Sequence, residues 1–217
     1  MLNHNDLLER TRHDRLVAII RLRHEAPLAR VAEALVAGGI RALEFTLTSP
    51  CAIPAITACR TRFGEDVIVG AGTVLDVEEA GRCLDAGAQF LVSPGFDPAV
   101  VALARERGAL AMPGALTPTE IVTAWRAGAD VVKVFPARAF GPRYIADLLA
   151  PLPQIPLMPT GGVDETNAAA YLHAGAVGVA VGGKLVAEDA VGRADWDALT
   201  ARARVLVVAV RQVGDQP

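Results

Sequence analysis

Short apolar runs recur at nearly even intervals along this chain, and segments with helical periodicity separate them. The eight runs hold 3–6 residues each and are apolar on both faces, as buried parallel strands are. They are Leu16–Ile20, Ala42–Leu47, Val67–Val69, Gln89–Val92, Ala109–Met112, Val131–Phe135, Ile155–Met158 and Val177–Val181. A chain that alternates strand and helix in this way is expected to fold into a parallel sheet covered by helices.

Glycines mark the ends of the helices between these runs. Each stands just before a strand, where the residue that follows a helix C-terminus belongs, at Gly38, Gly64, Gly87, Gly108, Gly128 and Gly175. Their separations are 26, 23, 21, 20 and 47 residues, and the longest interval holds one strand without such a mark. Helix starts carry capping residues or a proline at the first helical position, at Asp76–Glu79, Asp97–Pro98 and Thr117–Glu120.

A strand-and-helix unit of this length, repeated eight times, predicts an α/β protein with a single (β/α)8 TIM barrel, one domain over residues 1–217. An additional N-terminal helix, from about Asn5 to Asp14, is expected to cap the bottom of the barrel. The stretch Trp196–Val213 is expected to complete the outer ring of helices. A doubly wound open sheet is the alternative, although the chain lacks the glycine-rich dinucleotide loop of such sheets.

Composition limits the partners that we expect for this protein. The chain has 21 Lys and Arg against 24 Asp and Glu, and the resulting net charge of -3 argues against nucleic acid. No apolar run approaches the roughly 18 residues of a membrane helix, and the first residues lack the regions of a secretory signal. Three cysteines without a CxxC pair suit a reducing cytoplasm. Four scattered histidines without HxH or HExxH spacing predict no metal site, and we expect no other cofactor.

Lysine is rare in this chain, since only two of the 21 basic residues are lysines. One of them, Lys133, lies inside the apolar strand Val131–Phe135, so its amine is expected to point into the barrel. Burial disfavours the ammonium form, and a neutral amine can attack a carbonyl to form a Schiff base, which a guanidinium cannot do. The alternative is a structural lysine paired with a carboxylate.

Glu44 supplies a carboxylate that is expected to face the same interior. It lies in the apolar strand Ala42–Leu47, with its side chain directed inward. A carboxylate beside the amine of Lys133 can act as general acid and base during imine formation and carbon–carbon cleavage. A buried salt bridge between the two groups remains the alternative.

Two glycine-rich segments follow the last two predicted strands. Thr160-Gly161-Gly162 and Gly182-Gly183 expose backbone N–H groups where (β/α)8 enzymes commonly hold a phosphate. A short helix from about Leu185 is expected to add its positive N-terminal end. Lys184 either adds charge to the anion site or is a solvated loop residue.

Other residues are expected at the carboxyl ends of the strands, where the chemistry of a barrel takes place. Arg21 ends the first strand and is positioned to clamp a substrate carboxylate, with an ordinary surface arginine as the alternative. Thr73 offers a hydroxyl after the third strand, and Pro94 lies in the Ser-Pro-Gly segment after the fourth. Phe135 is expected to form part of an apolar wall.

Several motifs together resemble a known family. They are Ala34–Gly39, Leu43–Leu47, Val69–Leu75, Ala86–Phe90 with Ser93–Gly95, Lys133–Ala137 and Pro159–Val163. On these motifs the chain resembles the bacterial class I 2-keto-3-deoxy-6-phosphogluconate (KDPG) aldolases, including the 4-hydroxy-2-oxoglutarate (KHG) aldolase members. The resemblance extends from Leu16 to about Val186.

The resemblance implies a function and a role for each site residue. Lys133 would be the Schiff-base lysine and Glu44 the acid and base, while Thr73 and Thr160 contact the keto acid. The glycines that follow the last two strands would hold the phosphate. The implied reaction cleaves KDPG, and in some members KHG, and the products from KDPG are pyruvate and glyceraldehyde 3-phosphate. It needs no metal or other cofactor, belongs to Entner–Doudoroff metabolism and is carried out by a homotrimer.

Two positions differ from the gluconate-type members and leave alternatives open. Thr48 stands where many such members carry Arg, and Lys184 stands where they usually carry Ser. The segments Leu47–Pro50 and Phe135–Ile145, together with Arg21, look more like the 2-keto-3-deoxy-6-phosphogalactonate branch, whose aldolase is the nearest alternative. More distant alternatives are another phosphate-binding barrel enzyme, such as an epimerase or a thiamine-phosphate-type synthase, and a non-enzymatic sugar-phosphate sensor.

Overall fold

The computed structural model describes residues 2–213, and each of the eight apolar runs of the sequence overlaps a strand. They are β1 (Leu16–Ile20), β2 (Ala42–Thr46), β3 (Ile68–Gly72), β4 (Phe90–Val92), β5 (Leu110–Met112), β6 (Gly114–Ala115), β7 (Val132–Val134), β8 (Leu157–Pro159) and β9 (Val179–Val181). The two-residue β6 was not predicted. It follows Pro113, which lacks a backbone N–H and interrupts the strand that begins with β5.

Helices alternate with these strands. They are α1 (His4–Asp14), α2 (Leu28–Ala37), α3 (Ala52–Phe63), α4 (Val77–Asp85), α5 (Pro98–Glu106), α6 (Pro118–Arg126), the 3-10 helix η1 (Ala137–Ala139), α7 (Gly141–Leu149), α8 (Ala168–His173), α9 (Glu188–Gly192) and α10 (Trp196–Arg211). The capping signals are confirmed at Asp97 and Thr117, and Thr117 forms a complete capping box with Glu120. Asp76 accepts from the N–H of Glu79.

Gly38 was expected to be the left-handed glycine that follows α2, but the left-handed residue is the next one along the chain. Gly38 has helical dihedrals, and the left-handed residue is Gly39, at φ 101°. A Cβ on Gly38 would overlap the side chain of Ala203, so this glycine permits the close approach of α10. The left-handed glycines expected at Gly87, Gly108, Gly128 and Gly175 are confirmed.

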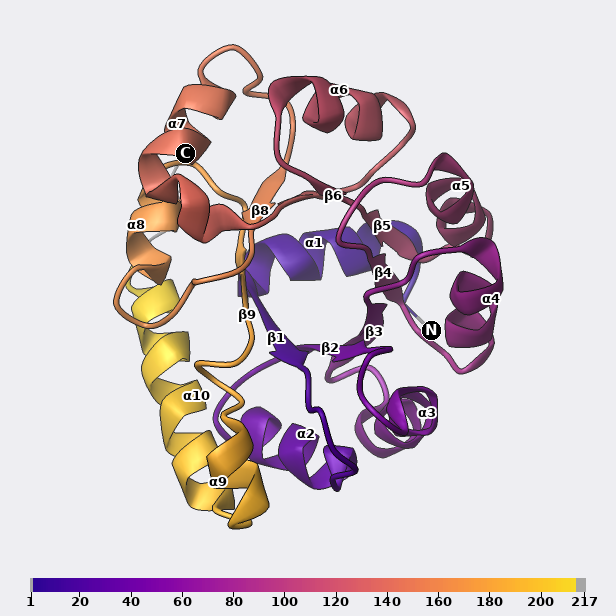
Figure 1. Cartoon of the computed structure of the whole chain (residues 1–217), viewed down its shortest axis with the longest axis vertical. Coiled ribbons are helices and arrows are strands. Elements are labelled where there is room, and N and C mark those ends of the chain that lie inside the picture. The colour runs from indigo at the N-terminus through magenta and orange to yellow at the C-terminus, as the bar shows by residue number, and fades with distance from the viewer. Residues whose placement is uncertain (1, 214–217) are drawn as a thin grey trace.

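All strand pairs are parallel, and they form two sheets. Six strands follow the order β5-β4-β3-β2-β1-β9, and three follow the order β6-β7-β8. The sheets curl, and Figure 1 shows the helices that follow α1 on their outer side. In the larger sheet consecutive strands are neighbours and the last strand pairs with the first, so the order lacks the reversal of a doubly wound fold. The chain therefore has an α/β fold built on curled parallel sheets.

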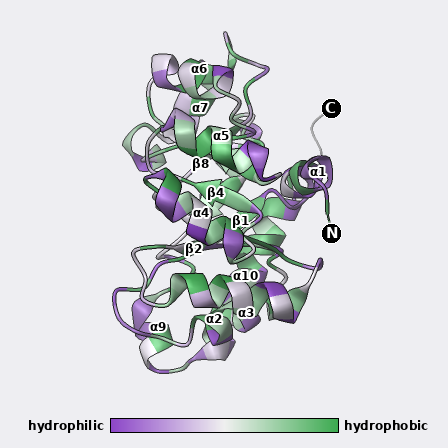
Figure 2. Cartoon of the chain, turned by 90° about the vertical axis from the view of Figure 1, so that its right-hand side faces the viewer, coloured by the Kyte–Doolittle hydropathy of each residue, from purple (hydrophilic) through white to green (hydrophobic). Residues whose placement is uncertain are grey.

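Alternate side chains on the strands enter two separate apolar clusters. The larger cluster fills the layer between strands and helices and includes Val132 and Val134 of β7. The smaller cluster fills the inside of the curl and includes Val17, Ile19 and Phe90. Figure 2 shows the hydrophobic residues concentrated in the strands and on one face of most helices. Because side chains alternate along a strand, Lys133 faces the inside of the curl.

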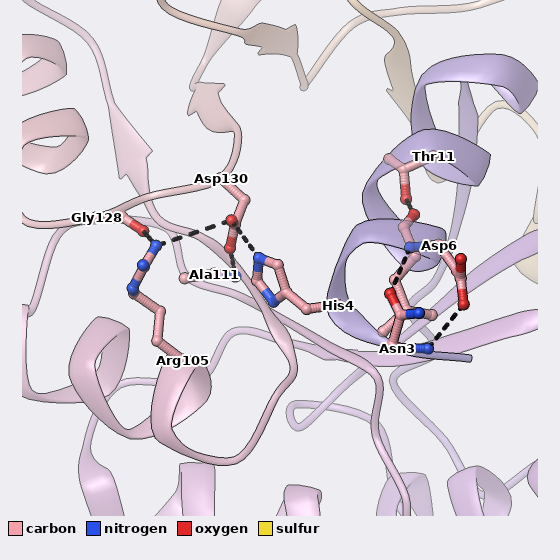
Figure 3. Close-up of polar contacts among 9 residues, drawn as sticks. Asn3, His4, Asp6, Thr11, Arg105, Ala111, Gly128 and Asp130 are labelled. Atoms are coloured by element: carbon pink, nitrogen blue, oxygen red, sulfur yellow. Dashed lines mark hydrogen bonds and ion pairs between the residues drawn. The ribbon is translucent and has the colours of Figure 1, made fainter. Parts of the chain in front are cut away.

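The predicted N-terminal helix is present and lies across one end of the strands (Figure 1, Figure 2). Leu7 of α1 belongs to the interior cluster. Figure 3 shows the polar anchor of this helix, in which His4 Nε2 lies 2.8 Å from Asp130 Oδ1, while Asp130 Oδ2 accepts from the N–H of Ala111. Asp130 precedes β7, so α1 covers the amino ends of the strands and leaves their carboxyl ends open.

Candidate active site

A cavity of about 470 Å³ opens at the carboxyl ends of β1, β7, β8 and β9. Nine of the residues predicted for the site line it, namely Arg21, Lys133, Phe135, Thr160, Gly161, Gly162, Gly182, Gly183 and Lys184. The other lining residues are Ile19, Arg138 and Val163. The curl of the sheets therefore brings together residues that are far apart in the sequence, such as Ile19 and Lys184, which are separated by 165 positions.

Lys133 occupies the middle of β7, between Gly114 of β6 and Met158 of β8. Its side chain is only 4% exposed, and Nζ lies 5.1 Å from the centre of the Phe135 ring. Burial is the main cause of a lowered pKa for this amine, and the charge of Arg21 lowers it further, while Glu44 opposes the shift. Lys133 is therefore biased toward the neutral form that a nucleophile requires.

Glu44 lies on β2, in register with Ile19 of β1 and Gly70 of β3. Its side chain is 0% exposed, and a Cβ on Gly72 would overlap its carboxylate, so the absence of a side chain at position 72 creates the slot that holds Glu44. Burial is the largest influence on the carboxyl group and raises its pKa, against the opposing charges of Lys133 and Arg21.

The carboxylate of Glu44 is unusual because neither oxygen has a hydrogen-bond partner among the described residues. Nor does an ion pair within 4.0 Å join Glu44 to Lys133 in that part of the chain. A structural salt bridge would place the two groups in direct contact. A buried, unpaired acceptor near a buried amine instead has the features of a group held for proton transfer.

The glycines Gly161, Gly162, Gly182 and Gly183, here termed the glycine corner, border the cavity after β8 and β9. Gly161 and Gly162 have φ angles of 90° and 85°, which side chains rarely adopt. The expectation of a helix from Leu185 was wrong. The N–H groups of Leu185 and Val186 both donate to the carbonyl of Gly182 in a single turn, and α9 begins only at Glu188.

The two cations predicted for the mouth of the cavity are both exposed. Arg21 lies two residues beyond Ile19, on the same inward-facing side of the chain. Its positive charge acts to lower the pKa of both Lys133 and Glu44. Lys184 lies near Asp164, whose pKa is lowered mainly by a hydrogen bond from Thr166 and also by the charge of Lys184.

Besides Glu44, which is fully buried, two predicted residues do not line the cavity. Thr73 follows β3 with a φ of 61°, and Pro94 follows β4, where its carbonyl packs against Gly114. Both strands end away from β8 and β9, which carry the glycine corner. Sequence reasoning also missed three lining residues. The alternation along β1 could have identified Ile19, whereas Arg138 lies in η1, outside any repeating pattern.

Within residues 2–213, no group of three or more His, Cys, Asp and Glu side chains is arranged to hold a metal ion. No helix in the same range combines the length and apolar character needed to cross a bilayer.

The sequence model of the KDPG and KHG aldolase family matches residues 7–202 of the chain. The chain belongs to this family. It is therefore an aldolase, a carbon–carbon lyase, and the family resemblance of the sequence motifs is confirmed.

Individual members of the KDPG and KHG aldolase family are similar along most of the chain. A 2-dehydro-3-deoxy-phosphogluconate aldolase from Treponema pallidum is 40% identical over 90% of this chain and 92% of that protein. A 2-dehydro-3-deoxy-6-phosphogalactonate aldolase from Escherichia coli is 38% identical over 78% of this chain and 83% of that protein. The structure of KDPG aldolase from Legionella pneumophila, with pyruvate captured as a covalent carbinolamine intermediate, superimposes with a TM-score of 0.81 at 30% identity, covering 88% of this chain and 93% of that chain.

Proposed function

We propose that this protein is a class I aldolase that cleaves KDPG to pyruvate and glyceraldehyde 3-phosphate through an imine on Lys133. The observation that carries the proposal is the buried amine of Lys133 at a cavity of about 470 Å³, with the unpaired carboxylate of Glu44 held behind it. The covalent carbinolamine with pyruvate in the Legionella relative supports the same chemistry. The substrate range includes KHG, in agreement with the family that the chain belongs to.

The reaction begins when the neutral amine of Lys133 attacks the C2 carbonyl of the substrate and forms a carbinolamine. Loss of water gives a protonated imine, which accepts the electron pair of the C3–C4 bond when that bond breaks. Glu44, acting through water, takes the proton of the C4 hydroxyl as the aldehyde forms. The remaining enamine is protonated at C3, and hydrolysis of the imine releases pyruvate and restores the amine.

The lining of the cavity suggests how the substrate lies. Arg21 would pair with the C1 carboxylate, Phe135 and Thr160 would contact the keto acid beside Lys133, and the glycine corner with Lys184 would hold the phosphate. Thr73 and Pro94 lie outside the cavity. In this proposal they are outer contacts of the keto-acid part, at the ends of β3 and β4.

Trapping with borohydride tests the mechanism directly. Reduction in the presence of pyruvate is expected to leave a stable adduct on Lys133, detected by mass spectrometry of the digested protein. If no adduct forms on Lys133, the imine mechanism is wrong. A sugar-phosphate sensor would bind its ligand reversibly without a mass increase, and loss of activity with a chelator would favour a metal-dependent barrel enzyme.

The phosphogalactonate epimer is the second candidate substrate. The similarity to the Escherichia coli galactonate-type enzyme and the position of Arg21 at the cavity favour it. Turnover measured side by side on the two epimers and on KHG decides between them. A galactonate-type enzyme would show the higher kcat/KM on the galactonate epimer.

We also infer that the two sheets belong to one closed (β/α)8 barrel in a single domain over residues 1–217. A bridge between Thr160 and Ala180 links β8 to β9, and the N–H of Val131 donates to the carbonyl of Ala111. A single cooperative unfolding transition is expected for such a domain.

The proposed assembly and compartment follow from the family resemblance and the free cysteines. The protein is expected to be a homotrimer with a role in Entner–Doudoroff metabolism, and light scattering would give its mass in solution. Cys51, Cys59 and Cys83 are free thiols, as suits the proposed cytoplasmic location. Fractionation of the source cells tests that location.

A further inference from the structure

Arg138 of η1 lines the same cavity as Lys133, although the sequence did not predict it as a site residue. Its backbone N–H donates to the carbonyl of Gly161 over 2.9 Å. A Cβ on Gly162 would lie 2.5 Å from Cβ and 3.3 Å from Cδ of Arg138, so the stem of the arginine runs across the face of this glycine. The fold therefore holds Arg138 against the glycine corner.

The guanidinium of Arg138 forms no hydrogen bond or ion pair with any residue in the range 2–213. Other exposed arginines do have acidic partners, such as Arg107 with Asp85 at 2.7 Å and Arg193 with Asp189 at 3.2 Å. Lys184, which also lines the cavity, lies close enough to Asp164 for its charge to lower the pKa of that carboxyl group. Arg138 is thus a cation at the cavity with its donors available to a ligand.

We propose that Arg138 is a specificity-determining residue that binds the terminal phosphate of the substrate and makes the enzyme prefer phosphorylated 2-keto-3-deoxy acids. This inference rests on the proposed aldolase function. A phosphate monoester carries a charge of about -1.5 to -2 at neutral pH. The planar guanidinium offers parallel N–H donors to two phosphate oxygens, which a lysine ammonium does not. An uncharged terminal hydroxyl would gain much less from the same contact.

The test compares the wild type with Arg138→Gln, Arg138→Lys and a control, Arg143→Gln. Arg143 is a suitable control because it lies on α7, is 93% exposed in its side chain and does not line the cavity. On KDPG, Arg138→Gln is expected to raise KM about 10- to 100-fold, the effect of losing a hydrogen bond between charged groups, with kcat little changed. Arg138→Lys should restore part of the loss. On unphosphorylated 2-keto-3-deoxygluconate, KM should be the same in all four proteins.

Calorimetric titration with glycerol 3-phosphate gives a readout that does not depend on turnover. Arg138→Gln is expected to weaken binding about 10- to 100-fold, while Arg143→Gln binds as the wild type does. Equal binding by Arg138→Gln and the wild type would overturn the proposal, as would an equal loss of kcat/KM on both substrates. Trapping of pyruvate on Lys133 of the wild type tests the aldolase mechanism separately. No adduct would contradict that mechanism, whereas a normal adduct together with equal binding of glycerol 3-phosphate by Arg138→Gln and the wild type would contradict only the role of Arg138.

Discussion

Replacement of Glu44 by methionine should make the folded protein more stable and greatly lower its activity. Methionine is similar in length to glutamate and fits the apolar interior without a charge. The carboxylate that it replaces is fully buried, lies against Gly72 and has no hydrogen-bond partner among the described residues. Burial outweighs the attraction of Lys133 and Arg21 in its effect on the pKa of Glu44. Removal of the charge therefore eliminates a desolvation penalty that is larger than the favourable attraction to Lys133 and Arg21 that is lost with it.

The size of the effect follows from these contacts. An unsatisfied buried polar group costs about 1–3 kcal/mol, so we expect Glu44→Met to raise the free energy of unfolding by about 2 kcal/mol. For a chain of this length, that gain corresponds to a rise in Tm of about 4–8 °C. Loss of a general acid and base should at the same time lower kcat by about 10²- to 10⁴-fold.

The stability gain should also depend on pH. Burial raises the pKa of Glu44 above its ordinary value of 4.5, so between these two values the folded protein holds a proton that the unfolded chain has released. In this window the wild type loses stability as the pH rises. The advantage of Glu44→Met is therefore largest above the raised pKa and shrinks as the pH falls toward 4.5.

Thermal and urea unfolding across this pH range measure the gain, and Glu44→Gln is the matched control. Glutamine removes the charge but keeps two polar atoms in the same slot, so it should lose activity with a smaller rise in Tm. A Tm of Glu44→Met below that of the wild type would show that attraction to Lys133 and Arg21 outweighs the burial penalty. Turnover at the wild-type rate would refute the role of Glu44 in proton transfer.

Three further substitutions test other parts of the site. Lys133→Arg should fold normally, as judged by circular dichroism, and lose almost all turnover, since a guanidinium forms no imine; substantial residual activity would instead favour a buried ion pair. Arg21→Gln should move the acid limb of the pH profile of kcat/KM to higher pH, because the charge of Arg21 lowers the pKa of Lys133. An acid limb at the same pH as in the wild type would contradict this effect of Arg21 on Lys133. Gly72→Ala should lower the free energy of unfolding by about 1–3 kcal/mol and reduce kcat, since the added methyl overlaps the carboxylate of Glu44. The control is Gly81→Ala in α4, where the added Cβ has no atom within 4 Å and should stabilise the helix by about 0.5–1 kcal/mol. Equal stability of the two variants would refute the claim that Gly72 leaves the space that Glu44 occupies.

Local features of the fold could be predicted because each depends on neighbours in the sequence. The apolar run Leu16–Ile20 coincides with β1 to the residue, and the capping box at Thr117 forms as expected. Predictions failed where distant residues decide the local structure. Gly38 was mistaken for the turn residue because its actual constraint, contact with Ala203, comes from a helix 165 positions further along the chain.

Sequence alone determined the alternation of buried strands and helices, the inward direction of Lys133 and the need for an amine at that position. These follow from side-chain periodicity and from the chemistry of lysine, which arginine does not share. Only the tertiary structure decided which strand ends share a cavity, since that depends on how the sheets curl. It brought Arg138 to the glycine corner, left Thr73 outside the cavity and isolated the carboxylate of Glu44 against Gly72. Burial and the resulting pKa shifts arise from contacts among many elements, and no single segment of the sequence encodes them.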